Sequence, residues 1–161
     1  MGLSSKKSAF TLIEIILVVL LLSVIAGLTI PNFRNSFRKV KLQNSANNIA
    51  YLMRYAQSRA ITKGVLVRFE FEHGSGKYWL AEQKNDVIGR DDEAFVKFSN
   101  KMGKNFSLPD GLTLGSEGLT ILFYPDGNIE KQAVKLCGEV SCLIISTREQ
   151  RGHVNVFEAE K

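Results

Sequence analysis

Residues 10–30 read FTLIEIILVVLLLSVIAGLTI, an apolar run with a single charged residue, Glu14. About twenty apolar residues in a helix are long enough to cross the ~30 Å hydrocarbon layer of a bilayer. Nine residues precede the run, and only Lys6 and Lys7 among them are charged. A secretory signal peptide has its cleavage site after its apolar run, whereas here Pro31 follows and no A-x-A pattern does. We therefore expect the run to stay in the mature protein as a transmembrane helix.

Glu14 is the residue in this run that calls for an explanation. A carboxylate near the centre of a membrane helix costs ~2.5–3.5 kcal/mol on insertion scales, and less nearer the end, where Glu14 lies. Two interpretations stay open. Glu14 is either a functional group that needs a cationic partner, or a side chain that snorkels to the lipid headgroups.

The stretch KKSAFTLIE at residues 6–14, followed by the apolar run, resembles the N-terminus of type IV prepilins and type II secretion pseudopilins. The resemblance implies cleavage between Ala9 and Phe10 by a prepilin peptidase, and N-methylation of the new Phe10 amine. It also implies that Glu14 pairs with the N-terminal amine of a neighbouring subunit during filament assembly. Ala9 stands where the family usually has glycine, and Pro31 falls where many pilins have a helix-kinking proline.

The same resemblance implies a location and a set of partners. The chain would be a single-pass protein of the bacterial inner membrane with its head domain in the periplasm. Its partners would be other pilin or pseudopilin subunits, both major and minor, the prepilin peptidase and an inner-membrane assembly platform.

Charge is distributed unevenly along the 161 residues, whose net charge is +5. Between Glu14 and Glu70 there are eight basic residues and no acidic one, whereas from Phe69 onward there are eleven basic and fifteen acidic residues, which is a net charge of −4. A basic helical segment thus precedes an acidic C-terminal half. The basic face is either covered by the acidic half or simply solvated.

The apolar pattern after Pro31 predicts an amphipathic stem helix over residues 31–63, which Lys63 and Gly64 end. The chain then divides into a cleavable leader (1–9), a transmembrane helix (10–30), the stem helix (31–63) and a β-rich head (64–161). The early apolar positions of the stem are Phe33, Phe37 and Val40. We expect a sheet to cover the later apolar positions, which are Leu42, Ala46, Ile49, Met53, Ala56 and Ala60.

The head reads as antiparallel β-structure. Residues 65–71 and 78–83 predict a hairpin around a Gly-rich turn, residues 95–98 a short strand, and residues 119–124 a strand closed by Pro-Asp-Gly-Asn. Residues 140–147 and 153–157 predict a last hairpin. The predicted fold class is therefore α+β, with a long N-terminal transmembrane helix packed on a C-terminal antiparallel sheet.

The segments LTILFYPDGN (119–128) and LIISTREQRGHVNVF (143–157) resemble the C-terminal pattern of the GspH/FimT group of minor pseudopilins and minor pilins. This implies a minor pseudopilin of the type II secretion system, a structural subunit at or near the tip of a periplasmic pseudopilus that drives protein export. The alternative is a minor pilin that primes type IV pilus assembly.

A third hypothesis is a minor pilin that captures DNA in natural transformation. It would use Arg148 and Arg151 together with Lys131 or Lys135. Phosphate binding needs clustered Lys and Arg, and the acidic character of the C-terminal half argues against DNA capture. We therefore expect no nucleic acid partner.

Cys137 and Cys142 are the two cysteines, and their spacing is not that of a Cys-x-x-Cys motif. If the head is exported, a disulfide closing a tight loop is expected; the alternative is two buried thiols that pack as small apolar groups. The two histidines, His73 and His153, lie in no metal-ligand or nucleophile motif. We expect no enzyme, no cofactor and no metal site.

Overall fold

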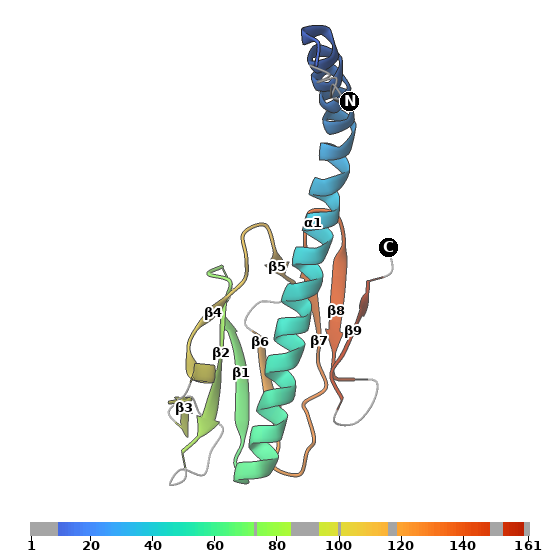
Figure 1. Cartoon of the computed structure of the whole chain (residues 1–161). Helices are drawn as coiled ribbons and strands as arrows, with labels where there is room; N and C mark the ends of the chain where they lie inside the picture. The colour runs from blue at the N-terminus through green and yellow to red at the C-terminus, as the bar shows by residue number, and fades with distance from the viewer. Residues whose placement is uncertain are drawn as a thin grey trace, which may run out of the picture. The chain divides into compact units, whose positions relative to one another are not determined.

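The computed structural model describes residues 10–72, 74–84, 94–99, 101–115, 119–148 and 153–159. Within these residues, helix α1 (Leu12–Lys63) is followed by nine strands and a short 3-10 helix (Figure 1). The chain divides into two compact units, of which the first ends at Phe37 and the second begins at Arg38. From here on, the head means this second unit, which includes the last part of α1 as well as the predicted β-rich part. The predicted leader (1–9) lies outside the described residues.

The first unit contains the apolar part of α1. Among the described residues, no helical stretch meets the length and apolarity that a membrane crossing requires. The transmembrane helix over residues 10–30 therefore stays a prediction. Pro31 lies within α1, but its side chain is outside the described part of the chain, and so the predicted kink stays a prediction as well.

In the head, α1 buries the predicted apolar stripe from Leu42 to Ala60, and Ile49 and Met53 are completely buried. The helix ends where the sequence predicts. The amide of Gly64 donates to the carbonyl of Ala60 over 2.9 Å, and Gly64 has φ 67°, a left-handed conformation that glycine adopts without a steric penalty.

The first sheet has the order β3-β2-β1-β6, with β4 also paired to β2. The predicted hairpin forms between β1 and β2, with Phe69 opposite Leu80. All pairings in this sheet are antiparallel. Its strands are β1 (Val67–Glu72), β2 (Lys77–Gln83), β3 (Phe95–Lys97), β4 (Phe106–Ser107) and β6 (Leu119–Phe123), and the 3-10 helix Lys101–Gly103 lies between β3 and β4.

The second sheet has the order β5-β7-β8-β9, again antiparallel throughout. Its strands are β5 (Thr113–Leu114), β7 (Ala133–Cys137), β8 (Cys142–Ser146) and β9 (Asn155–Glu158). The sequence predicted the last hairpin as β8 and β9 form it. It predicted a single sheet, however, and missed β5 and β7 here and β4 in the first sheet.

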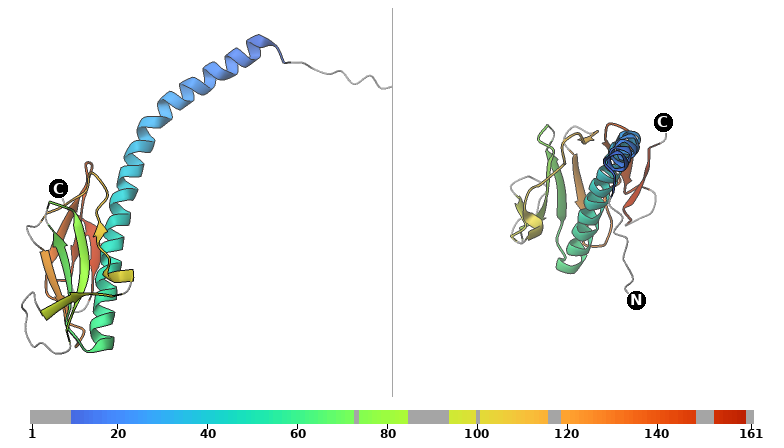
Figure 2. Two further views of the ribbon diagram at one scale, coloured as in Figure 1. Left: turned by 90° about the vertical axis from the view of Figure 1, so that its left-hand side faces the viewer. Right: turned by 45° about the horizontal axis from the view of Figure 1, so that its top comes forward.

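The helical part of the head packs across both sheets, and the left view in Figure 2 shows the strands on one side of this part of α1. One continuous core joins α1 to side chains of both sheets, among them Phe69 and Ile121 of the first and Leu136 and Ile145 of the second. A smaller cluster around Phe95 lies on the opposite face of the first sheet, where Ala81 is also buried. The described fold is α+β with a helix packed on antiparallel sheets.

Candidate functional site

The N-terminal site that the sequence predicts lies at the start of α1. Phe10 is 77 % exposed, and Glu14 is exposed in the first turn of the helix. The carbonyl of Thr11 accepts the amides of Glu14 (3.1 Å) and Ile15 (3.4 Å), so the helix begins directly after Thr11. A carboxylate in the first turn is favoured by the helix dipole, and here it stands on an otherwise apolar surface. Ala9 lies outside the described residues.

The surface around Glu14 is apolar on every side of the helix. Every large aliphatic side chain from Leu12 to Ile25 is exposed, by 46 to 78 %. The one serine in this segment, Ser23, donates its hydroxyl to the carbonyl of Val19 over 2.7 Å and so adds no free donor. A helix that is apolar all round needs apolar surroundings, either lipid or other apolar helices.

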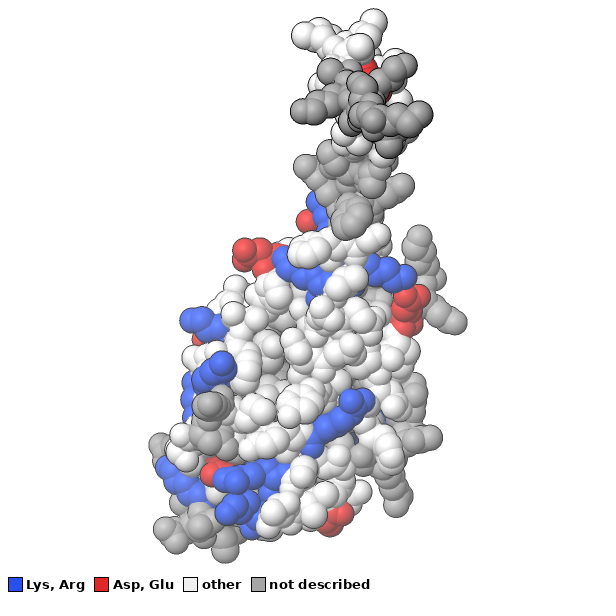
Figure 3. Space-filling view, viewed as in Figure 1, with Lys and Arg blue, Asp and Glu red and all other residues white. Residues whose placement is uncertain are grey.

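A set of basic residues at the start of the helical part of the head contacts three different parts of the β-structure. We name it the basic collar. Figure 3 shows Lys and Arg at this level of α1 and again near the end of the helix, with largely uncharged surface between them. The collar contacts are Arg38 Nη1 to Glu139 Oε2 at 2.6 Å, Lys39 Nζ to Glu158 Oε1 at 3.3 Å, and Lys41 Nζ to the carbonyl of Asp110 at 2.7 Å.

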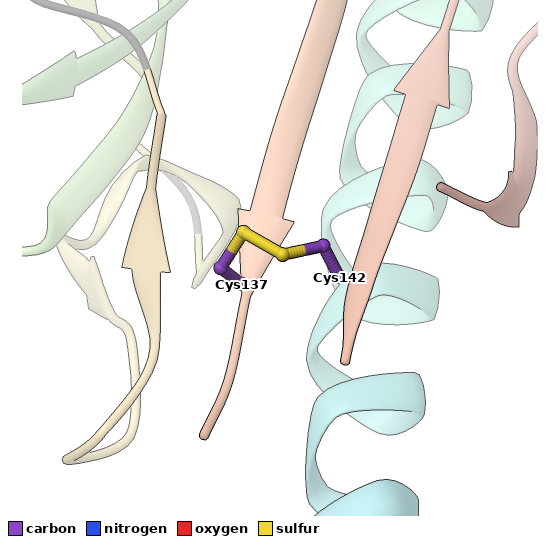
Figure 4. Close-up of a disulfide and its surroundings, with 2 residues drawn as sticks. All are labelled: Cys137 and Cys142. Carbon is purple, nitrogen blue, oxygen red and sulfur yellow. A yellow bond between two sulfur atoms is a disulfide. The ribbon is translucent and has the colours of Figure 1, made fainter. Parts of the chain in front are cut away.

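Cys137 and Cys142 form a disulfide between the end of β7 and the start of β8 (Figure 4). They are directly opposite each other in the register, with Cα atoms 4.1 Å apart. The loop that the disulfide closes carries Glu139, the partner of Arg38 in the basic collar.

The structure brings together only part of the basic set that the DNA hypothesis requires. The buried Thr147 hydroxyl donates to the carbonyl of Glu130 over 2.6 Å and accepts the amide of Gln132 at 2.9 Å, which joins the segment of Lys131 to the end of β8, next to Arg148. Lys135 lies further along β7, opposite Ile144. Arg151 lies outside the described residues.

Two further observations concern metal ligands and cavities in the described part of the chain. No group of three or more His, Cys, Asp or Glu residues there is placed to hold a metal ion. A hollow of about 290 Å³ between the β1–β2 turn and β5 is lined mainly by apolar side chains, such as Phe71, Leu108 and Leu112.

Sequence reasoning missed the partners of the basic residues. It showed that α1 has no acidic residue of its own after Glu14, so any partner had to come from elsewhere in the chain. Which acidic residue meets which basic one depends on the packing of the sheets against the helix. Nothing in the local sequence of Glu139 or Glu158 gives that information.

A helix that is apolar and exposed in its first part, with one carboxylate in its first turn, and packed on antiparallel sheets in its second part, defines a type IV pilin-like structural subunit. The model of the family described as "Type II transport protein GspH" matches residues 45–151. The match covers more than half of the chain, and the chain belongs to this family.

Solved structures share the fold at low sequence identity. Two structures of the minor pseudopilin EpsH from the type II secretion system of Vibrio cholerae are 11 % and 13 % identical to the chain, with TM-scores of 0.60 and 0.61. They cover 75 % and 76 % of this chain, and 98 % and 97 % of their own. The type IV minor pilin FimU of Pseudomonas aeruginosa is 13 % identical with a TM-score of 0.54, covering 76 % of this chain and 92 % of its own. No curated protein matches the chain in sequence.

Proposed function

We propose that the chain is a minor pseudopilin of the type II secretion system, a structural subunit at or near the tip of a periplasmic pseudopilus. The observation that carries the proposal is the all-round apolar, exposed segment from Leu12 to Ile25 with Glu14 in its first turn, in a chain of the GspH family. Residues 10–30 would hold the chain in the inner membrane by one span, with the head in the periplasm.

Glu14 is the assembly group in this proposal. The prepilin peptidase cuts between Ala9 and Phe10, and the Phe10 amine is methylated. In lipid an unpaired carboxylate is costly, and the N-terminal cation of a neighbouring major or minor subunit relieves that cost. The pairing would fix the axial register of one subunit on the next while the inner-membrane platform adds subunits, and Pro31 would let the helix bend as it packs.

The role is structural, and we propose neither catalysis nor a cofactor. The contacts that the head offers are exposed ion pairs, sheet edges and apolar patches, which suit assembly with other pilin-like subunits.

The test uses the full-length protein in the membrane of its own bacterium, with Glu14→Ala compared with Glu14→Asp. Both variants are expected to insert and to lose the leader. The Ala variant should be absent from isolated filaments, whereas the Asp variant, which keeps the charge, should be retained at least in part. Filaments that contain the Ala variant at the normal level would refute the pairing.

Intact mass measurement of the membrane-extracted protein tests processing separately. We expect loss of residues 1–9 and one methyl group on Phe10. A retained leader would mean that Ala9 blocks cleavage, and would favour a plain membrane anchor.

The second candidate is a minor pilin that primes a type IV pilus, which the likeness to FimU favours. Deleting the chain discriminates between the two machines. Loss of exported proteins from the medium with normal surface pili supports the secretion system, and the opposite outcome supports the pilus.

A further inference from the structure

We propose that the free edge of β9 is a docking site for an extended, acidic segment of a partner subunit, which adds to the second sheet as a further strand. The proposal rests on the proposed function, since it names a surface through which the head contacts another subunit of the filament.

The first step is the direction of the backbone groups of β9. In an antiparallel pair, hydrogen-bonded residues alternate with residues whose N–H and C=O point the other way. The amide of Ala159 donates to the carbonyl of Cys142 over 3.1 Å, so this pair is hydrogen-bonded. Every second residue of β9 has the same backbone direction, so the N–H and C=O groups of Phe157 and Asn155 also point towards β8. Val156 and Glu158 therefore point their N–H and C=O groups away from the sheet.

The outward backbone groups of Val156 and Glu158 have no hydrogen-bond partner among the described residues. In the edge strand β6 of the first sheet, the same alternation makes Thr120 and Leu122 the outward residues. The amide of Leu122 donates to Oε2 of Glu130 over 3.1 Å, and its carbonyl accepts the amide of Glu130 at 2.9 Å. One glutamate thus closes the edge of β6 at Leu122 with its side chain and its backbone. No such closure exists at Val156 and Glu158 in the described part of the chain, so β9 offers up to four backbone hydrogen bonds.

The second step is the apolar surface beside this edge. Phe157 lies opposite Ile144 in the register, so the two side chains share the face of the sheet that points away from α1. Phe157 is 37 % exposed, Ile144 is half-buried, and Val140, at the disulfide-closed end of the hairpin, is 53 % exposed. A strand added to β9 would bury an apolar side chain of its own against Phe157.

The third step identifies the chemistry of the partner. Nη2 of Arg54 donates to the carbonyl of Val154 over 2.8 Å. Val154 directly precedes β9, so the guanidinium of Arg54 lies beside the start of this strand. Arg54 is exposed and has further N–H donors. A carboxylate on the α1 side of the incoming strand, level with Val154, would accept them in a charge-assisted contact.

A second copy of this chain fits the edge less well. Arg54 contacts Val154 and Lys39 contacts Glu158, so β9 runs antiparallel to the helix of the head. Two copies paired antiparallel through β9 would have head helices running in opposite directions. Subunits anchored in one membrane do not share that arrangement, which disfavours antiparallel β9–β9 pairing of two copies, and we assign the occupant to a segment of a different subunit.

The experiment places a photo-crosslinking phenylalanine analogue at Phe157 of the full-length protein in its own membrane. The same analogue at Lys97, on the edge strand β3 of the first sheet, is the matched control. The crosslinked peptide is sequenced by mass spectrometry. The probe is then combined with Arg54→Glu, which changes an exposed side chain, and separately with Val156→Pro, which removes an outward N–H without breaking a bond to β8.

We expect an adduct at position 157 to one extended segment that carries Asp or Glu, and about a ten-fold loss of that adduct in the Arg54 and Val156 variants. Arg54→Glu alone keeps the test valid if the proline variant does not fold. An adduct that neither variant reduces, or equal adducts at 157 and 97, would overturn the docking site. A failure of the proposed function gives a different result from a failure of the docking site. In that case the Glu14→Ala variant would be present in filaments at the normal level, whether or not the adduct at position 157 forms.

Discussion

Removing the disulfide should lower the free energy of unfolding of the head by an amount that depends on the length of the loop that the bond closes. The change is the double variant Cys137→Ser/Cys142→Ser in the full-length protein in detergent. The two cysteines are five positions apart, so the bond closes a very short loop. The chain-entropy relation gives about 2 kcal/mol for a loop of this size, near the lower end for disulfides.

Thermal unfolding followed by circular dichroism measures this loss. A loss of about 2 kcal/mol in a head of this size corresponds to a fall in Tm of roughly 5–10 °C. Glu139→Gln is the matched control, because it removes the ion pair that the same loop makes with Arg38. That pair is half-exposed, 49 % and 58 % by side chain, so the control should cost no more than about 1 kcal/mol.

Two results would refute the reasoning. A change in Tm of the double variant no larger than that of Glu139→Gln would mean that the bond does not constrain the unfolded chain. Two free thiols in the wild-type protein, counted by alkylation and mass spectrometry, would mean that the bond does not form in the native head.

Three further predictions concern the head. Met53→Ala should cost about 2–4 kcal/mol in chemical denaturation, because Met53 is completely buried, whereas Tyr51→Ala, on the exposed side of the same helix, should cost less than about 1 kcal/mol. Glu70→Ala should cost about 2 kcal/mol or more, since its partner Arg68 is only 8 % exposed and 2.6 Å away; an effect below about 0.5 kcal/mol would contradict this. Burial raises the pKa of Tyr78 above its usual 10.0, so its neutral form is favoured in the fold. The contribution of Tyr78 to stability is complete below roughly pH 10 and is lost as the pH rises through the folded-state pKa. Denaturation curves across this range should fall more steeply for the wild type than for Tyr78→Phe, and parallel curves would contradict the assignment.

The helix and its end were predictable because their signals are local. The buried positions from Leu42 to Ala60 recur every three or four residues, and that spacing places them on one face of a helix whatever packs against it. Gly64 follows directly, and the left-handed conformation that ends the helix suits glycine best. Both features depend on a few neighbouring residues.

The division into two sheets was not predictable in the same way. Strand β7 is five residues long and carries Lys135 at its centre, so its apolar alternation rests on Val134 and Leu136 alone. Strands β4 and β5 have two residues each and are strands only because distant segments pair with them. The sequence marks turns well, but it does not say which strands become neighbours across the head.

The two candidate sites differ in the same way: one depends on local sequence and the other on the pairing of strands. Glu14 stands out in the sequence because a charge in an apolar run is rare, and its neighbours along the chain are enough to identify it. The open edge of β9 cannot be predicted from the sequence. Which residues of β9 point their backbone groups outward depends on how this strand pairs with β8. In the sequence, Arg54 is one of eight basic residues with nothing to distinguish it. Only its contact with Val154 shows that it lies beside β9.

The basic segment of α1 raises a question of assembly, since like charges on neighbouring helices repel. Arg38, Lys39 and Arg59 all pair with acidic residues of the β-structure. Most of these side chains are exposed, so the pairs add little stability, but they remove net charge from the helix surface. Between Lys41 and Arg54 the helix carries no charged residue at all, and its exposed side there consists of amides and Tyr51. The segment that is free to meet a neighbour is therefore neutral, and the basic composition of the helix does not oppose side-by-side packing of subunits.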